Sequence, residues 1–171
     1  MIKIVKFTDM DPKPYWSSPR GRAIMCAYAG VDYLTACVFT YENHERIGPL
    51  FYFELPTMHQ TLELLSKAVA LMEDNTFNPQ KYNHHVKKIM KDYAGQILNF
   101  KSILSYPHTL LLLDGLEKSY LEVRYGECSL SYDGDAWLLF RRIADNLLDD
   151  IRSRTDLPFR YGKLSPVMPT E

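Results

Sequence analysis

The spacing of apolar residues along the chain predicts two kinds of secondary structure. In its first third, aromatic and β-branched residues alternate with polar ones or run together, which favours strands. Gly30-Val31-Asp32 and the polar run 42–49 suit hairpin connections between them. The predicted strands cover residues 2–7, 22–29, 33–41 and 50–55. These four strands are predicted to form a meander.

From Met58 onward the apolar spacing changes to three and four residues, which is typical of an amphipathic helix. This spacing predicts helices over 58–72, over 79–100 and over 135–154. Pro79 suits the first position of the second helix, where a missing backbone donor costs nothing. The third helix is predicted to bury one continuous face, made up of Trp137, Phe140, Ile143, Ala144, Leu147, Leu148 and Ile151.

Between the second and third helices the pattern again favours strands, over 109–113, 120–125 and 128–132. Asp114-Gly115 and Gly126-Glu127 are the turn signals that separate them. The order of strands, helices, strands and helix predicts an α+β fold. We expect a mostly antiparallel sheet of about six to seven strands with about three amphipathic helices packed on it.

Length and composition favour a single folded domain. The chain has 171 residues, of which 46% are hydrophobic and 24% are charged, close to the averages of globular proteins. We expect one globular domain over 1–171, with the proline-containing segment 157–171 as an extended tail. The formal net charge of −1 supplies no overall field that would attract nucleic acid or an anionic membrane.

The compartment signals favour the cytoplasm. The first residues lack the features of a signal peptide, and unbroken apolar runs such as Leu110 to Leu113 are far shorter than the roughly 20 residues of a membrane span. Three cysteines without metal-type spacing suit a reducing environment. Cys26 and Cys37 are expected to face each other on neighbouring strands as free buried thiols, with a redox pair as the alternative.

Sequence motifs for catalysis are missing from the chain. It contains neither of the common glycine-rich phosphate motifs nor the Gly-x-Ser-x-Gly setting of a serine hydrolase. His84 and His85 are neighbours on a predicted helix, so they diverge and cannot hold one metal ion. Asp133-Gly134-Asp135 is interpreted as the start of a helix and not as a calcium loop. We expect no catalytic residue, metal or cofactor.

Charge is distributed unevenly along the chain. Residues 75–101 hold five lysines against Asp92, whereas 109–156 hold six basic and ten acidic residues. Lys81, Lys88 and Lys91 share one side of the predicted 79–100 helix with His84, and could contact phosphates. A nucleic-acid-processing enzyme or binding factor is therefore the alternative to a protein-binding function. A phage or assembly subunit that pairs by strand addition is a third possibility.

Residue types that anchor protein interfaces gather in three segments. The proline-rich loop 9–21 carries aromatic and arginine side chains, although Trp16 could instead cover one end of the sheet. A hairpin tip and the exposed face of the third helix add carboxylates and an imidazole. The predicted partner-binding residues are Tyr15, Trp16, Arg20, Glu42, His44, Glu45, Asp145, Asp149 and Asp150.

Three features of the C-terminal part resemble bacterial toxin-immunity proteins of contact-dependent growth inhibition systems. Thr109–Tyr132 as strands, Asp135–Arg154 as a closing helix and the acidic excess of this half carry the resemblance. It implies non-catalytic, one-to-one neutralisation of a cognate protein toxin, often a nuclease, by covering its active site or substrate surface. Acidic side chains would then complement a basic cleft and speed association. It implies neither a membrane partner nor a small-molecule cofactor.

Overall fold

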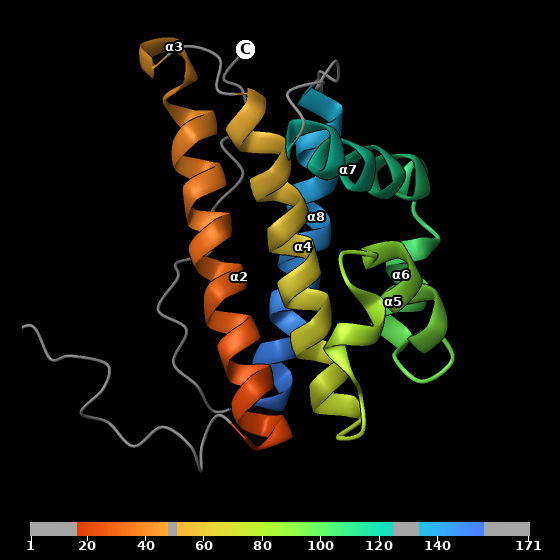
Figure 1. The fold of residues 1–171 in the computed structure, drawn as a ribbon. Coiled ribbons are helices and arrows are strands. Elements are labelled where there is room, and N and C mark those ends of the chain that lie inside the picture. The colour runs from red at the N-terminus through yellow and green to blue at the C-terminus, as the bar shows by residue number, and fades with distance from the viewer. Residues whose placement is uncertain (1–16, 48–50, 125–133, 156–171) are drawn as a thin grey trace, which may run out of the picture.

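The computed structural model describes residues 17–47, 51–124 and 134–155, and every regular element among them is helical (Figure 1). The elements are α2 (Pro19–Glu42), α3 (His44–Ile47), α4 (Phe51–Glu73), the 3-10 helix η2 (Pro79–Tyr82), α5 (Val86–Tyr93), α6 (Leu98–Leu104), α7 (Thr109–Arg124) and α8 (Gly134–Arg154). The predicted α+β fold is therefore wrong, because the described residues contain no strand.

Helix α2 occupies the stretch in which two strands, 22–29 and 33–41, were expected. It begins where the Ser18 side chain accepts a hydrogen bond from the Gly21 backbone N–H, at 2.9 Å, with Pro19 at the first position. Gly30-Val31-Asp32 forms no hairpin and lies inside the helix. Residues on its buried side recur every three or four positions, namely Ala23, Ala27, Gly30, Leu34 and Cys37.

Helix α4 confirms the helix expected over 58–72 and extends it toward the N-terminus. The strand expected over 50–55 is wrong, since α4 begins at Phe51 and continues through Pro56. Pro56 lies in the second turn of α4, where it has no N–H to donate, so the helix forms despite the loss of one backbone hydrogen bond. The buried side again follows a heptad spacing, with Leu55, Met58, Leu62, Leu65 and Val69 at most 4% exposed.

Helices α2 and α4 lie side by side and antiparallel along most of their length (Figure 1). Gly30 allows this close approach, because a Cβ atom at that position would lie 2.8 Å from Leu65 Cδ2 and 3.3 Å from the Leu65 backbone nitrogen. Matching heptad spacings and small residues on one partner thus produce a tightly packed helical hairpin.

The helix expected over 79–100 is broken into η2, α5 and α6. Asn83 follows η2 with a φ of 44°, in the left-handed region, which turns the chain before α5 begins. Pro79 does occupy the first position of η2, and the Asn78 side chain accepts from the Gln80 N–H at 3.0 Å. The apolar residues that the spacing placed on one side of this helix are buried except for Leu98, which is 79% exposed. The buried ones are Tyr82, Val86, Ile89, Met90, Tyr93 and Ile97.

The C-terminal half combines one wrong and one confirmed prediction. Residues 109–113 and 120–124, expected in strands, belong to α7, and Asp114-Gly115 lies inside that helix. Helix α8 forms where the third helix was expected, and all of its predicted core residues are buried. The remaining predictions, for 2–7, 125–132 and the tail 157–171, lie outside the described residues.

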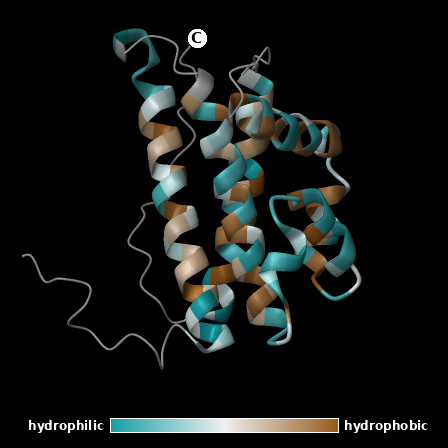
Figure 2. Cartoon of the chain, in the orientation of Figure 1, coloured by the Kyte–Doolittle hydropathy of each residue, from teal (hydrophilic) through white to brown (hydrophobic). Residues whose placement is uncertain are grey.

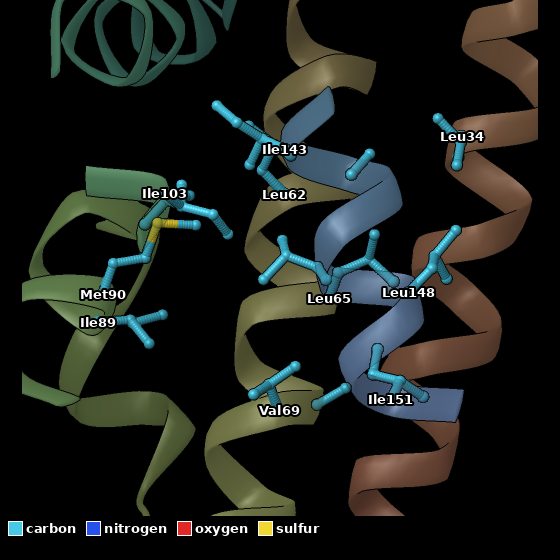
Figure 3. Packing of buried hydrophobic residues seen from close by; sticks show 14 of the residues in the cluster. Leu34, Leu62, Leu65, Val69, Ile89, Met90, Ile103, Ile143, Leu148 and Ile151 are labelled. Carbon is cyan, nitrogen blue, oxygen red and sulfur yellow. The ribbon is translucent and has the colours of Figure 1, made fainter. Parts of the chain in front are cut away.

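Helix α4 is the centre of the core (Figure 3). Its Leu62, Leu65 and Val69 point among side chains of three neighbours, α2, α8 and the α5–α6 region. The neighbouring side chains in this view are Leu34, Ile89, Met90, Ile103, Ile143, Leu148 and Ile151. Helix α7 packs against α4 and α5 near the end of the bundle where α4 begins (Figure 1).

Both described cysteines lie on α2, about 16 Å apart along the helix axis, so their expected positions on neighbouring strands are wrong. Disulfide geometry requires a much shorter separation, and both thiols are free. Burial raises the pKa of the Cys37 thiol to about 12, although the Thr61 hydroxyl 4.0 Å away opposes the rise. Burial also raises the pKa of Cys26.

Candidate partner-binding site

The structure separates the predicted partner-binding residues into two groups at opposite ends of the bundle. The first group contains Arg20, in the first turn of α2, and the aspartates toward the end of α8, which ends near the same end of the bundle (Figure 1). The other group, Glu42, His44 and Glu45, is exposed where α2 meets α3 at the opposite end, about 33 Å away along the helix. Tyr15 and Trp16 lie outside the described residues.

Two of the three predicted aspartates of α8 are exposed as expected, whereas Asp150 is nearly buried, and Asp149 and Asp150 line a hollow. Asp145 and Asp149 are exposed, whereas the side chain of Asp150 is 10% exposed. The hollow has a volume of about 440 Å³ and lies between α8 and the start of α6. We call it the α6–α8 hollow; it is lined by Asn146, Asp149, Asp150 and Arg154 from α8, and by Gln96, Leu98 and Asn99 from the other side.

A chain of side-chain contacts fixes the amide wall of the α6–α8 hollow. Asn99 Nδ2 donates to the backbone oxygen of Asn146 at 2.7 Å. Asn146 Nδ2 in turn donates to the Tyr106 hydroxyl at 3.1 Å. The Arg142 guanidinium lies over the Tyr106 ring, 4.1 Å from its centroid, and holds that ring in place. Both amides therefore have defined orientations.

Ion pairs fix the charged wall of the same hollow. Arg154 Nε donates to Asp150 Oδ1 at 2.6 Å, and Arg154 Nη1 donates to Glu73 Oε2 at 2.5 Å. These contacts tie the end of α8 to the end of α4. The second oxygen of Asp150, Oδ2, is buried and has no hydrogen-bond partner among the described residues. A buried carboxylate oxygen without a donor is costly, so the ion pair of Asp150 with Arg154 is what compensates the burial of this side chain.

The remaining acidic residues of α8 differ in their surroundings. Asp149 pairs with Arg152 at 3.0 Å but stays 73% exposed. Partial burial raises the pKa of the Asp145 carboxyl, Arg141 and Arg152 oppose this rise, and Asp149 adds to it. The net field at this end of α8 is therefore weaker than the aspartates alone would produce.

The basic segment 75–101 is partly neutralised by α7. Lys87 Nζ forms an ion pair with Asp114, and the Lys87 backbone N–H donates to Glu117 Oε1 at 2.9 Å. Lys81 and Lys88 remain exposed, with their ammonium groups near the Tyr82 ring. Lys87 therefore faces α7 and does not join Lys81 and Lys88 as a free positive charge on the surface. The contact also shows that the basic segment 75–101 and the acidic segment 109–156 touch each other.

Sequence reasoning missed a buried polar cluster that centres on Glu63 of α4. Glu63 Oε1 accepts from Lys67 Nζ at 2.5 Å, and its Oε2 lies 3.0 Å from His84 Nδ1. His59 lies beneath, with its Nε2 2.9 Å from the backbone oxygen of His84 and its ring stacked on Tyr120. The spacing of His59, Glu63 and Lys67, four residues apart on an expected helix, was the available signal.

The cluster around Glu63 fits a structural role. Its carboxylate is 4% exposed and its two oxygens contact a lysine and an imidazole, which compensates the burial of the charge. Among the described residues no group of three or more His, Cys, Asp or Glu side chains could hold a metal ion. His84 and His85 were expected inside a helix, but they lie between η2 and α5. His85 occupies the N-cap position of α5, and its Nδ1 lies 3.3 Å from Glu117 Oε2.

Helix α2 is apolar on more than its core-facing side. Its 24 residues are long and apolar enough to cross a membrane, but half of the most apolar stretch is buried inside the bundle. Figure 2 shows α2 in a mixture of hydrophobic and pale colours along its length. The aromatic side chains of Tyr28, Tyr33 and Phe39 on this helix are at least 40% exposed. One such helix, packed against α4, is weak support for a membrane span.

No model of a known protein family, no curated protein and no solved structure matches this chain. The inferences about its function therefore depend on its own residues. Among the described residues, the α6–α8 hollow combines a cavity, buried charge and two of the predicted partner-binding residues.

Proposed function

We propose that this chain is a non-catalytic protein-binding protein of the bacterial toxin-immunity type, which acts in the cytoplasm by covering the active site or substrate surface of a cognate toxin. The observation that carries the proposal is the position of Asp149 and Asp150 on a hollow at the end of α8. Hollows that combine charged groups, amides and an apolar side chain suit an anchor residue of a partner.

The charge of this surface supports a basic partner. Asp145 and Asp149 are exposed on α8, and Asp150 adds a buried carboxylate beside them. Such carboxylates complement the cationic cleft with which a nuclease binds its substrate. Complementary charge raises the rate of encounter and lowers the affinity for acidic competitors.

The rigidity of the surface also supports binding without catalysis. Arg154 joins α8 to α4 through Asp150 and Glu73, so the hollow keeps its shape before a partner arrives. A preorganised surface loses little conformational entropy on association. This is the property that a tight stoichiometric inhibitor needs.

The proposal is tested by co-expression with the product of the adjacent reading frame in a bacterial host. We expect that product to stop growth alone, and this chain to restore growth and co-purify with it in a one-to-one complex. The association rate should fall at least about tenfold between about 0.05 and 0.5 M salt.

Charge reversal identifies the surface that binds. The double variant Asp145→Lys with Asp149→Lys should lose protection and complex formation, because both side chains are exposed and leave the core intact. The matched control is Asp32→Lys on the outer side of α2, which is also exposed and should still protect. If the wild-type chain forms no complex, the proposed function is wrong; if both reversals behave alike, α8 is not the surface.

A further inference from the structure

We infer that the α6–α8 hollow binds the ammonium group of a lysine side chain presented by the partner protein, an inference that rests on the proposed function. The hollow is open to solvent and measures about 440 Å³, so a side chain can enter it from outside. Its lining supplies hydrogen-bond acceptors, negative charge and one apolar wall. Each of these three features favours binding of a lysine side chain for a different reason.

The fixed amides leave acceptors facing a ligand. Asn99 and Asn146 both use their NH₂ groups in contacts with the protein, to a backbone oxygen and to the Tyr106 hydroxyl. Each contact uses one of the two NH₂ hydrogens, and no donor among the described residues reaches either side-chain carbonyl oxygen, so both oxygens can accept from a ligand. A ligand that only donates hydrogen bonds, such as an ammonium group, suits this wall.

The charged wall selects a cation. Asp150 is nine-tenths buried, and its Oδ1 is occupied by Arg154 while its Oδ2 has no partner among the described residues. Asp149 adds a second carboxylate at the exposed rim. Arg154 lies in the same hollow and pairs with Asp150 and Glu73, and Arg152 pairs with Asp149. These three carboxylates outnumber the two guanidiniums by one negative charge, which favours a cation.

The apolar wall suits the stem of a long side chain. Leu98 is 79% exposed at the start of α6, although its spacing predicted a core position. A lysine stem of four methylene groups can pack on this side chain while its ammonium group reaches the acceptors. The acceptors come from separate points on α6 and α8, which suits the three donors of an ammonium group better than the planar fork of a guanidinium.

The experiment uses the full chain and the peptide acetyl-Gly-Lys-Gly-amide at millimolar concentration. We expect saturable NMR shifts at the side-chain amide signals of Asn99 and Asn146 and at the methyl signals of Leu98. The same peptide with an acetylated lysine Nζ should leave these signals unchanged, because it has lost its charge. The arginine analogue should bind more weakly.

Matched variants assign the contacts. Asp150→Asn should weaken peptide binding at least about tenfold, because a negative charge beside the ammonium group is lost. The exposed Asp32→Asn on α2 should have no effect. Leu98→Ala should weaken it about threefold through lost apolar contact, while Leu111→Ala, 70% exposed on α7, should not. The Leu98 variant keeps the test meaningful if Asp150→Asn impairs folding.

The inference is overturned if the peptide causes no saturable shift at these residues, if the acetylated peptide binds equally, or if the control variants weaken binding as much as the hollow variants. Such a result leaves the proposed function standing when the wild-type chain still protects cells and forms its complex. Conversely, a peptide that binds in the hollow while no toxin complex forms removes the proposed function and keeps a lysine-binding site.

Discussion

Single residues fix the distances and charges inside this bundle. Gly30 sets the separation of α2 and α4, because any larger side chain there meets Leu65. Glu63 holds a buried charge between Lys67 and two imidazoles. Each of these residues lies in the core, where small changes in volume or charge have large effects on stability.

Replacing Gly30 with alanine should destabilise the protein by about 1 kcal/mol, since a packing cost of about 1–3 kcal/mol exceeds the roughly 1 kcal/mol gained in helix propensity. The new Cβ would lie 2.9 Å from Leu65 Cγ, in a side chain that is fully buried. Gly115→Ala on α7 is the matched control, because its Cβ would meet nothing within 4 Å. Urea unfolding should show the control gaining about 0.5–1 kcal/mol; a stabilised Gly30→Ala would contradict the close packing.

Protonation of His59 should destabilise the protein in mild acid. Burial lowers the pKa of His59. The charges of Glu63 and Glu117 and the hydrogen bond to the His84 backbone oxygen only partly oppose this, and the charge of the His84 imidazole adds to the fall. The folded molecule then binds fewer protons than the unfolded chain once the pH falls below about 6.5, so stability declines with falling pH until the folded pKa is passed.

The pH dependence is measured as the free energy of unfolding between about pH 7.5 and 5. His59→Gln should flatten this slope, whereas His85→Gln, whose side chain is 56% exposed, should leave it as in the wild type. Equal slopes in the wild type and the His59 variant would show that His59 is not buried in its neutral form.

The thiol of Cys37 should resist alkylation in the native protein. Burial raises its pKa to about 12, so the reactive thiolate is scarce at neutral pH, and the side chain is 1% exposed. Mass spectrometry after iodoacetamide treatment at about pH 8 should find Cys37 unmodified until denaturant is added. Rapid labelling of Cys37 in the folded chain would place it near the surface.

At the scale of elements, the sequence predicted where α8 begins and which residues it buries, because a strong three-to-four spacing is hard to misread. The sequence-based prediction was wrong for α2 and α7, which were expected to be strands. Apolar residues occur on most sides of these helices, so the repeat of three to four residues that marks a helix is not visible in the sequence. The heptad spacing of Ala23, Ala27 and Gly30 was present, but small residues give a weak hydrophobic signal.

The candidate site was predicted in part for the same reason. Asp149 could be assigned to the outer side of α8 from its period alone, whereas the near burial of Asp150 beside Arg154 could not. The hollow could not be predicted, because it depends on the break before α6 that leaves Leu98 exposed. The positive φ of Asn83, which ends η2, has no distinctive signal in the surrounding residues.

The start of α5 depends on a carboxylate from α7. Glu117 accepts from the Lys87 N–H, in the first turn of α5, at 2.9 Å. We expect Glu117→Ala to cost about 1 kcal/mol, the usual value of a lost helix cap, and Glu117→Gln to cost less. Lys118→Ala, at an exposed position of α7, is the control. If both alanine variants unfold at the same urea concentration, Glu117 does not stabilise α5.

At the scale of the whole molecule, opposite charges compensate each other within the fold. The net charge is −1, and the basic segment meets α7 through Lys87 and Asp114. The predicted bipolar surface is reduced by this contact. Exposed pairs such as Arg152 with Asp149 contribute little to stability.

Stability should therefore depend weakly on ionic strength. Raising the salt concentration from about 0.05 to 0.5 M should change the free energy of unfolding by less than about 1 kcal/mol, because the exposed pairs are weak and the Glu63 cluster is shielded from solvent. The change is measured by unfolding with heat or with urea, because guanidinium chloride would itself alter the ionic strength. A large loss of stability in high salt would mean that surface pairs hold the bundle together.

The two-sided apolar character of α2 has a consequence for synthesis on the ribosome. Its 24 residues are translated before α4, which supplies the Leu65 contact to Gly30. Until that partner emerges, the nascent helix exposes apolar side chains in every direction and is a target for chaperones that bind hydrophobic segments. Pairing of α2 with α4 joins segments that are close in sequence, so this contact can form before the rest of the bundle has been translated.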